Sequence, residues 1–187
     1  MLHAFYSQAD LDNVPYPSPL TGQGTLSDAG SPICCASMMI ENMLDLCFPP
    51  EECARFALRV GARNAEGTNL PILCGALAGR FSLGLRTTDD LGEVLAALTE
   101  DASRRAILTI QPPPMPSHPG LGGLYQLLLD GLEGDQLRIL DPRFRPGRGV
   151  GRARHRRVRM QGNYTIATPE IIREFHTAEP YYIFSLN

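Results

Sequence analysis

Two adjacent cysteines, Cys34 and Cys35, are the residues whose chemistry first stands out. They lie in the first turns of a nearly all-apolar stretch, residues 33–46, which predicts a helix buried on all sides. Gly30 allows a sharp turn before this helix, and Ser31 suits its N-cap. Because a helix N-terminus carries partial positive charge, it can lower the pKa of a nearby thiol and favour nucleophilic chemistry.

The other cysteines and histidines show no spacing typical of a metal site, and no CxxC pair occurs. We therefore expect neither a metal nor a cofactor. An odd number of cysteines, without a regular framework, favours a reducing compartment. The first ten residues lack the features of a signal peptide, so we expect a cytoplasmic location. These other residues are Cys47, Cys53, Cys74, His3, His155 and His176.

A run of arginines without any acidic residue extends from Arg143 to Arg159. Such a run is typical either of an anion-binding or nucleic-acid-binding patch or of a solvated loop. Phe144 is the one aromatic residue in the run that could stack on a base, and glycines interrupt it. We therefore expect residues 143–162 to form a basic flexible loop without specific nucleic-acid binding, and an anion-binding module stays an alternative.

Length and composition favour a single domain over residues 1–187. The hydrophobic content of 43% suffices for a core, and the net charge of −3 gives no overall attraction to nucleic acid or membrane. No apolar run is long enough to span a bilayer, so we expect no membrane partner. Prolines in residues 1–22 favour an extended N-terminal segment.

Helical patterns dominate the first half of the chain and strand patterns the second, which is typical of an α+β fold. After the cysteine-bearing helix, we expect helices over residues 50–60, 70–81 and 90–101, and a short one over 169–175. The expected strands are residues 105–111, 124–131, 136–141 and 180–186. Glu133-Gly134-Asp135 would join the second and third of these strands as a hairpin.

The segment before the first helix resembles a motif of papain-like cysteine peptidases of the bacteriocin-leader (double-glycine) type. That motif is a glutamine, five residues, Cys-Gly-Pro and then an apolar helix. Here Gln23 takes the position of the oxyanion-hole glutamine, and Ala29 takes the position of the nucleophile. Ser31 also interrupts the Gly-Pro step.

A second motif extends the resemblance, which covers roughly residues 17–184. In the family, a strand that begins Gly-His-Tyr is followed by a turn and a strand that ends in Asp-Pro. This chain has Gly123-Leu124-Tyr125 and, after the turn, Asp141-Pro142. Asp141 thus matches the residue that orients the catalytic histidine, whereas Leu124 takes the position of that histidine.

The resemblance implies a papain-like fold, with an N-terminal helical half packed on a C-terminal antiparallel sheet. It also implies a degenerate site, because Ala29 and Leu124 carry neither a thiol nor an imidazole. A single engineered substitution would explain Ala29 but not Leu124, so we interpret the chain as a naturally inactive homologue that binds a peptide or protein partner. The alternative is an active cysteine peptidase or acyl-transfer enzyme in which Cys34 is the nucleophile and His118 the base.

Overall fold

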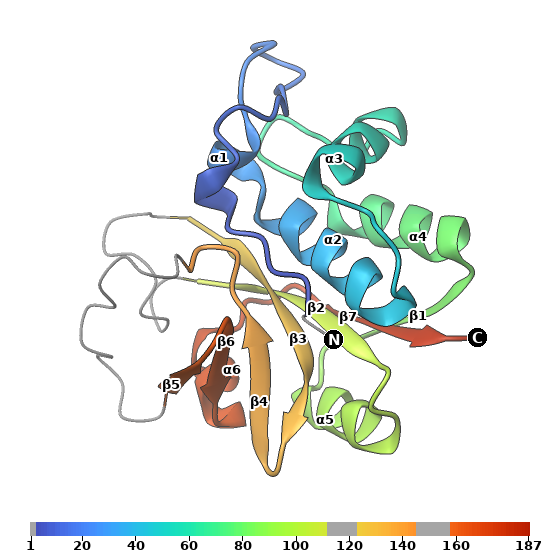
Figure 1. Ribbon diagram of the computed structural model, residues 1–187, viewed down its shortest axis with the longest axis vertical. Coiled ribbons are helices and arrows are strands. Elements are labelled where there is room, and N and C mark those ends of the chain that lie inside the picture. Colours follow the sequence, from blue (N-terminus) through green and yellow to red (C-terminus); the bar gives the residue numbers. More distant parts are fainter. Residues whose placement is uncertain (1–2, 112–122, 145–157) are drawn as a thin grey trace.

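The computed structural model describes residues 3–111, 123–144 and 158–187, and within them a seven-stranded sheet lies between two groups of helices (Figure 1). All neighbouring strands are antiparallel, in the order β1-β7-β2-β3-β4-β6-β5. The strands are β1 (Leu83–Thr88), β2 (Arg105–Ile110), β3 (Tyr125–Glu133), β4 (Gln136–Leu140), β5 (Val158–Gln161), β6 (Tyr164–Ala167) and β7 (Tyr181–Leu186).

The helices follow the predicted pattern closely, and each predicted helix is present. They are a short 3-10 helix, η1 (Gln8–Asp10), and the α-helices α1 (Leu26–Ala29), α2 (Ser31–Leu44), α3 (Pro50–Arg59), α4 (Leu70–Phe81), α5 (Leu91–Glu100) and α6 (Pro169–Phe175). The α+β class and the hairpin between β3 and β4 are therefore confirmed.

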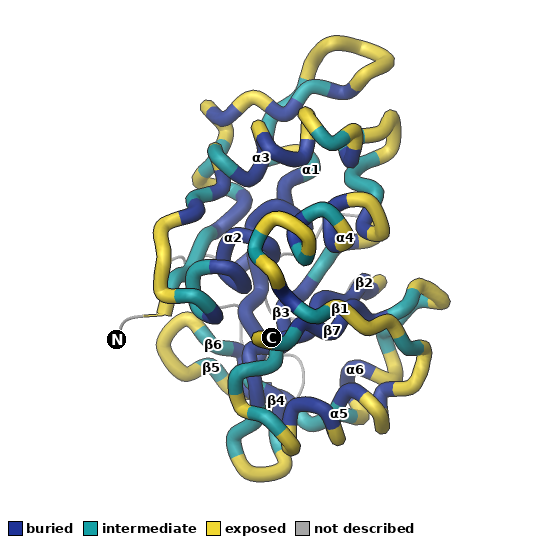
Figure 2. Tube along the Cα trace, turned by 90° about the vertical axis from the view of Figure 1, so that its right-hand side faces the viewer, coloured by how far each residue is buried: buried dark blue, intermediate teal, exposed yellow. Residues whose placement is uncertain are grey.

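Helix α2 is the core element of the fold, as its apolar sequence predicts. Every residue from Ser31 to Ile40 is buried, and Figure 2 shows the helix as an almost unbroken buried segment. It packs against β3 and β2 of the sheet and against α3. The helix ends at Leu44, two residues before the predicted end, because Asp45 adopts the left-handed conformation.

The sheet has a hydrophobic core on each face, because alternate residues of a strand point to opposite sides. On β3, Leu128 packs in the core formed with α2, α3 and α4, while Leu127 and Leu129 pack in the core formed with α5 and α6. Helices therefore cover both faces of the sheet. This differs from the expected arrangement, in which one helical half packs on one sheet half.

The buried carboxylate of Asp130 joins four strands on the side of the sheet that carries α2. It accepts hydrogen bonds from Arg105 of β2, from Arg138 of β4 at 3.0 Å and from the Tyr164 hydroxyl of β6 at 2.7 Å. The carboxylate is fully buried, so these charged partners offset the cost of removing it from water.

The local conformation differs from the predicted one at α1 and at the strands β1, β5 and β6, of which β6 (Tyr164–Ala167) was not predicted. Residues 26–29 form the one-turn helix α1, with a capping box between Thr25 and Asp28, rather than a loop. Residues 83–88 form the edge strand β1, which was not predicted. Residues 158–161 of the expected flexible loop 143–162 form strand β5, because Val158 is buried opposite Ala167 of β6. Residues 145–157 of that loop lie outside the described residues.

Gly30 joins α1 to α2, and its role differs from the predicted one. Its φ of −90° is open to any residue, so no special backbone freedom is needed. A β-carbon at this position would instead overlap the backbone carbonyl of Leu26. The glycine therefore allows the close approach of α1 to the start of α2, which sets the position of Ser31.

In the part of the chain that the structure describes, no helix combines sufficient length with sufficient apolar character to cross a membrane.

Candidate functional site

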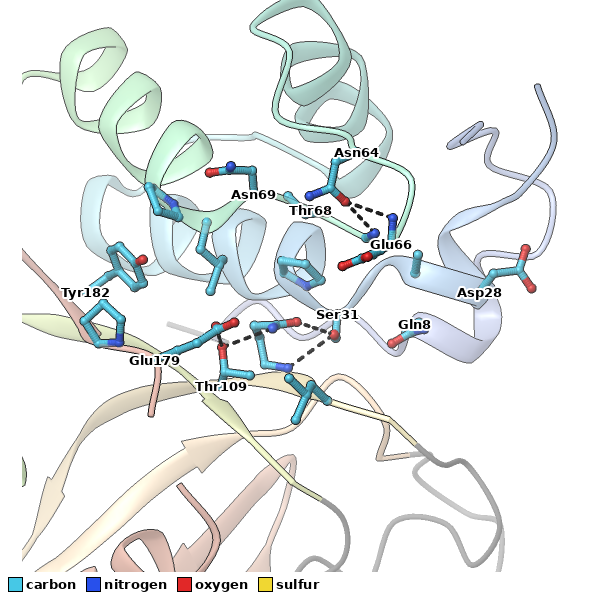
Figure 3. A pocket seen from close by; sticks show the side chains of 18 of the residues that line it. Gln8, Asp28, Ser31, Asn64, Glu66, Thr68, Asn69, Thr109, Glu179 and Tyr182 are labelled. Carbon is cyan, nitrogen blue, oxygen red and sulfur yellow. Dashed lines mark hydrogen bonds between the residues drawn. The ribbon is translucent and has the colours of Figure 1, made fainter. Parts of the chain in front are cut away.

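A cleft with a volume of about 450 Å³ lies where the N-terminus of α2 meets the sheet (Figure 3). Its walls come from segments far apart in the sequence: η1, the α1–α2 junction, the loop before α4, strands β2 and β3, and the start of β7. The fold thus brings polar side chains together at the end of an otherwise apolar helix–sheet interface.

Ser31 and Gln126 form the direct contact between helix and sheet in this cleft. The Ser31 hydroxyl donates a hydrogen bond to Gln126 Oε1 at 2.8 Å, and the backbone N–H of Gln126 donates to Ser31 Oγ at 3.2 Å. Ser31 is the first residue of α2 rather than its N-cap as predicted, and Gln126 is the second residue of β3. The pair therefore places a hydroxyl at a helix N-terminus opposite an amide on the sheet.

The hydrogen-bonded chain continues from Gln126 into the sheet. Gln126 Nε2 donates to Thr109 Oγ1 at 3.2 Å, and the Thr109 hydroxyl donates to Glu179 Oε2 at 2.6 Å. The register explains the first of these contacts, because Gln126 of β3 lies directly opposite Thr109 of β2. Four side chains are thus connected in the order Ser31, Gln126, Thr109 and Glu179 (Figure 3).

Ser31, Gln126 and Thr109 are arranged like a nucleophile, a general base and the group that orients the base, but they lack the chemistry of those groups. A general base must accept a proton in the transition state, and a side-chain amide does not do so near neutral pH. Without a base, a serine hydroxyl remains a weak nucleophile even at a helix N-terminus. Gln126 therefore holds Ser31 in place without activating it.

The loop between α3 and α4 forms one wall of the cleft and is held rigidly. Asn64 Oδ1 accepts hydrogen bonds from the backbone N–H groups of Glu66 and Gly67, at 3.1 and 2.7 Å. The Arg63 guanidinium donates to the carbonyls of Asn64 and Gly67, and it lies over the Tyr16 ring. These contacts fix the position of Glu66, an exposed residue that lines the cleft.

Gln8 is a site residue that the sequence analysis missed. It is only 6% exposed, yet it lines the cleft from the N-terminal segment. Its Nε2 donates to the Ser27 carbonyl at 2.8 Å, and its backbone N–H donates to the Pro142 carbonyl. Among the described residues, no donor reaches Gln8 Oε1. No local sequence signal marks Gln8, because its position depends on contacts with residues distant in the chain.

The structure places two of the four family-derived positions in the cleft. Ala29 and Leu124 both line it, and Leu124 is 51% exposed. Asp141 is buried, is not among the residues that line the cleft, and accepts a hydrogen bond from the backbone N–H of Arg143 at 2.8 Å. Gln23 is exposed and is not among the residues that line the cleft.

Cys34, the nucleophile of the alternative pair, is fully buried in α2. Burial strongly raises the pKa of its thiol, and that of the neighbouring Cys35, above the ordinary value. A raised pKa leaves almost no thiolate at neutral pH. His118, the proposed base of this pair, lies outside the described residues.

Within the described ranges, no group of three or more histidine, cysteine, aspartate or glutamate side chains is placed to hold a metal ion. The polar side chains that line the cleft are mostly hydroxyls, amides and carboxylates, which suit hydrogen bonding to a polar ligand.

No family model and no curated protein matches the chain. Among solved structures, its fold is similar to that of a Bacillus anthracis protein named as a presumed C39-like peptidase. The TM-score is 0.57 with 11% sequence identity, and the match covers 94% of this chain and 96% of that chain. At this identity the likeness shows the fold alone, and that fold is the C39-like peptidase fold.

Proposed function

We propose that this chain is a catalytically inactive relative of cysteine peptidases that binds a peptide or protein segment in its cleft without cleaving it. The observation that carries the proposal is the hydrogen bond between Ser31 and Gln126. This pair supplies a hydroxyl and an amide at a helix N-terminus in the cleft, whereas cysteine-peptidase chemistry needs a thiolate and an imidazole within hydrogen-bond reach.

Two features of the site support inactivity. Ser31 faces an amide that cannot accept its proton, and Ala29 has no reactive group. The thiol of Cys34 has a raised pKa and is shielded from solvent. A displaced pair of Cys34 and His118 would need this thiol to become exposed and ionised, and the experiments below would detect such a change.

The character of the cleft supports peptide binding. Its lining combines backbone and side-chain hydrogen-bonding groups with the apolar surfaces of Leu124, Pro32 and Tyr182. Ligand sites typically combine apolar surface with a few placed polar groups in this way. The half-exposed side chain of Leu124 offers an apolar contact on the rim of the cleft.

A substitution on the rim tests the proposal. Leu124→Arg introduces a bulky charged side chain into the cleft, whereas Leu20→Arg makes the same change at a position that is 80% exposed and outside the cleft. Peptides selected from a displayed library by the wild-type protein would be measured for binding to both variants by fluorescence polarisation. We expect Leu124→Arg to weaken binding at least about tenfold and Leu20→Arg to leave it unchanged.

Mass spectrometry of the same peptides after incubation provides the second half of the test. Intact peptides together with loss of binding in Leu124→Arg would support the proposal. Equal binding by both variants would show that the cleft is not the binding site, and cleaved peptides would show that the protein is an enzyme.

A further inference from the structure

The cleft has an excess of acidic groups among the described residues that line it. Three carboxylates, those of Asp28, Glu66 and Glu179, belong to lining residues, against one arginine, Arg143. The Arg143 guanidinium lies over the ring of Tyr125, with its central carbon 4.0 Å from the ring centroid. The positive charge is therefore already in contact with an aromatic face.

Among the described residues, no arginine forms an ion pair with Glu66 or Glu179. Within the ranges that the structure covers, no salt bridge joins either carboxylate to an arginine or histidine. Figure 3 shows Glu66 above Ser31 and Glu179 to its left, beside Thr109. A segment that crosses the cleft over Ser31 would therefore pass near both carboxylates.

An unsatisfied acceptor provides a second, independent indication of the ligand. Gln8 is 94% buried, and in Figure 3 its oxygen end points toward Ser31. No described donor reaches this oxygen, whereas the amide nitrogen is held by the Ser27 carbonyl. A buried acceptor without a donor is unfavourable, so a ligand that brings an N–H group to the cleft would relieve this cost.

The partial positive charge at the N-terminus of α2 acts in the opposite direction. It lies at Ser31, and Pro32 removes one of the backbone donors that would bind an anion there. The carboxylates of Glu66 and Glu179 belong to residues that line the cleft near this position, and the acceptor of Gln8 faces it, so the side chains around it favour a donor over an acceptor.

We propose that the cleft selects peptide segments that carry a basic side chain, arginine or lysine, next to the residue that passes over Ser31. This inference rests on the proposed function and specifies its ligand. Glu66 and Glu179 would attract the cation, and Gln8 would accept a hydrogen bond from an N–H group of the peptide.

A positional library tests the preference directly. Acetylated, amidated hexapeptide pools, each with one position fixed as a single amino acid, would be measured for binding by fluorescence polarisation. We expect pools with fixed arginine or lysine to bind at least about tenfold more tightly than pools with fixed aspartate or glutamate, given the contribution of about fivefold per exposed ion pair. The preference should shrink in 0.5 M salt because exposed charges are screened.

Neutral variants identify the groups responsible. The double variant Glu66→Gln and Glu179→Gln keeps side-chain size and the acceptor for Thr109, and it should reduce the preference to within about twofold. Asp135→Asn, at the tip of the β3–β4 hairpin and outside the cleft, removes one carboxylate and should leave the preference unchanged. Gln8→Met should weaken binding of the basic pools about fivefold.

The outcomes separate this inference from the proposed function. Intact peptides whose tightest pools are apolar or acidic would overturn the basic preference and leave the binding function standing. Basic pools that bind tightly and are cleaved would overturn inactivity and leave the preference standing. Failure of every pool to bind would overturn both proposals. A basic preference that persists in the double glutamine variant would overturn the role of the two carboxylates.

Discussion

Replacing Ser31 by cysteine and Gln126 by histidine should create a thiol–imidazole pair at the N-terminus of α2. Ser31 Oγ lies 2.8 Å from Gln126 Oε1, so a ring nitrogen at position 126 would lie within hydrogen-bond reach of a thiol at position 31. Thr109, which now accepts from Gln126 Nε2 at 3.2 Å, would accept from the other ring nitrogen and orient the imidazole.

The expected effect on the thiol pKa can be worked from these distances. The helix N-terminus alone contributes about 0.3–1 kcal/mol in favour of the thiolate, and burial of position 31 acts against it. An imidazolium at about 4 Å contributes on the order of 4 kcal/mol at an effective dielectric constant of about 20. We therefore expect the thiol of Ser31→Cys with Gln126→His to titrate at least about 2 pH units below that of Ser31→Cys alone.

The pH dependence of iodoacetamide alkylation measures this difference. The variants would be made in a Cys47→Ser background, since Cys47 is the exposed cysteine among those described. The matched comparison is Ala29→Cys with Leu124→His, which places the same pair at the positions derived from the family motif. Hydrolytic turnover is not required, because a misplacement of about 1 Å can cost on the order of a hundredfold in rate.

Equal titration of the thiol in the Ser31→Cys single variant and in the double variant would refute the reasoning that positions 31 and 126 can hold a thiol and an imidazole within hydrogen-bond reach. If the thiol pKa is lowered only in the double variant Ala29→Cys with Leu124→His, the thiol and imidazole positions are those that the family motif indicates.

Three further predictions concern the core and the stability of the fold. Because burial raises the pKa of Cys34, iodoacetamide at pH 8 should leave it unmodified in the folded protein, and rapid alkylation that disappears in His118→Ala would favour the displaced pair instead. Gly30→Ala should lower the free energy of unfolding in urea by about 1–3 kcal/mol, because the added methyl overlaps the α1 backbone; no change would contradict the close approach. Asp130→Asn should lower it by about 3 kcal/mol, because two arginines lose their charged partner, and a loss below about 1 kcal/mol would show that the network is unimportant.

The sequence predicts much of the fold because the relevant signals are local. The apolar run of α2, the turn chemistry of Glu133-Gly134-Asp135 and the proline before Glu170 each act within a few residues. Strand β1 escaped prediction because its middle residues are exposed and it lies at the edge of the sheet, so no apolar alternation marks it. Strand β5 escaped because arginines surround its buried Val158.

The site was less predictable because its contacts join distant parts of the chain. Ser31 and Gln126 are 95 residues apart, and Thr109 and Glu179 are 70 residues apart. The available signals were the polar residue Gln126, which precedes three leucines in β3, and the hydroxyl of Ser31 at the start of the core helix. Two positions derived from the family motif, Ala29 and Leu124, line the cleft, but spacing alone did not identify the side chains that meet there.

Analysis of new peptide termini tests the central claim most directly. A diverse peptide mixture would be incubated with the wild-type protein between pH 5 and pH 8, and mass spectrometry would detect termini absent from a control without protein. Inactivity predicts that no new terminus accumulates at any pH, because Ser31 lacks a base and Cys34 lacks thiolate character. New termini that appear with the wild-type protein and vanish in Cys34→Ser or in Ser31→Ala would contradict the claim and identify the nucleophile.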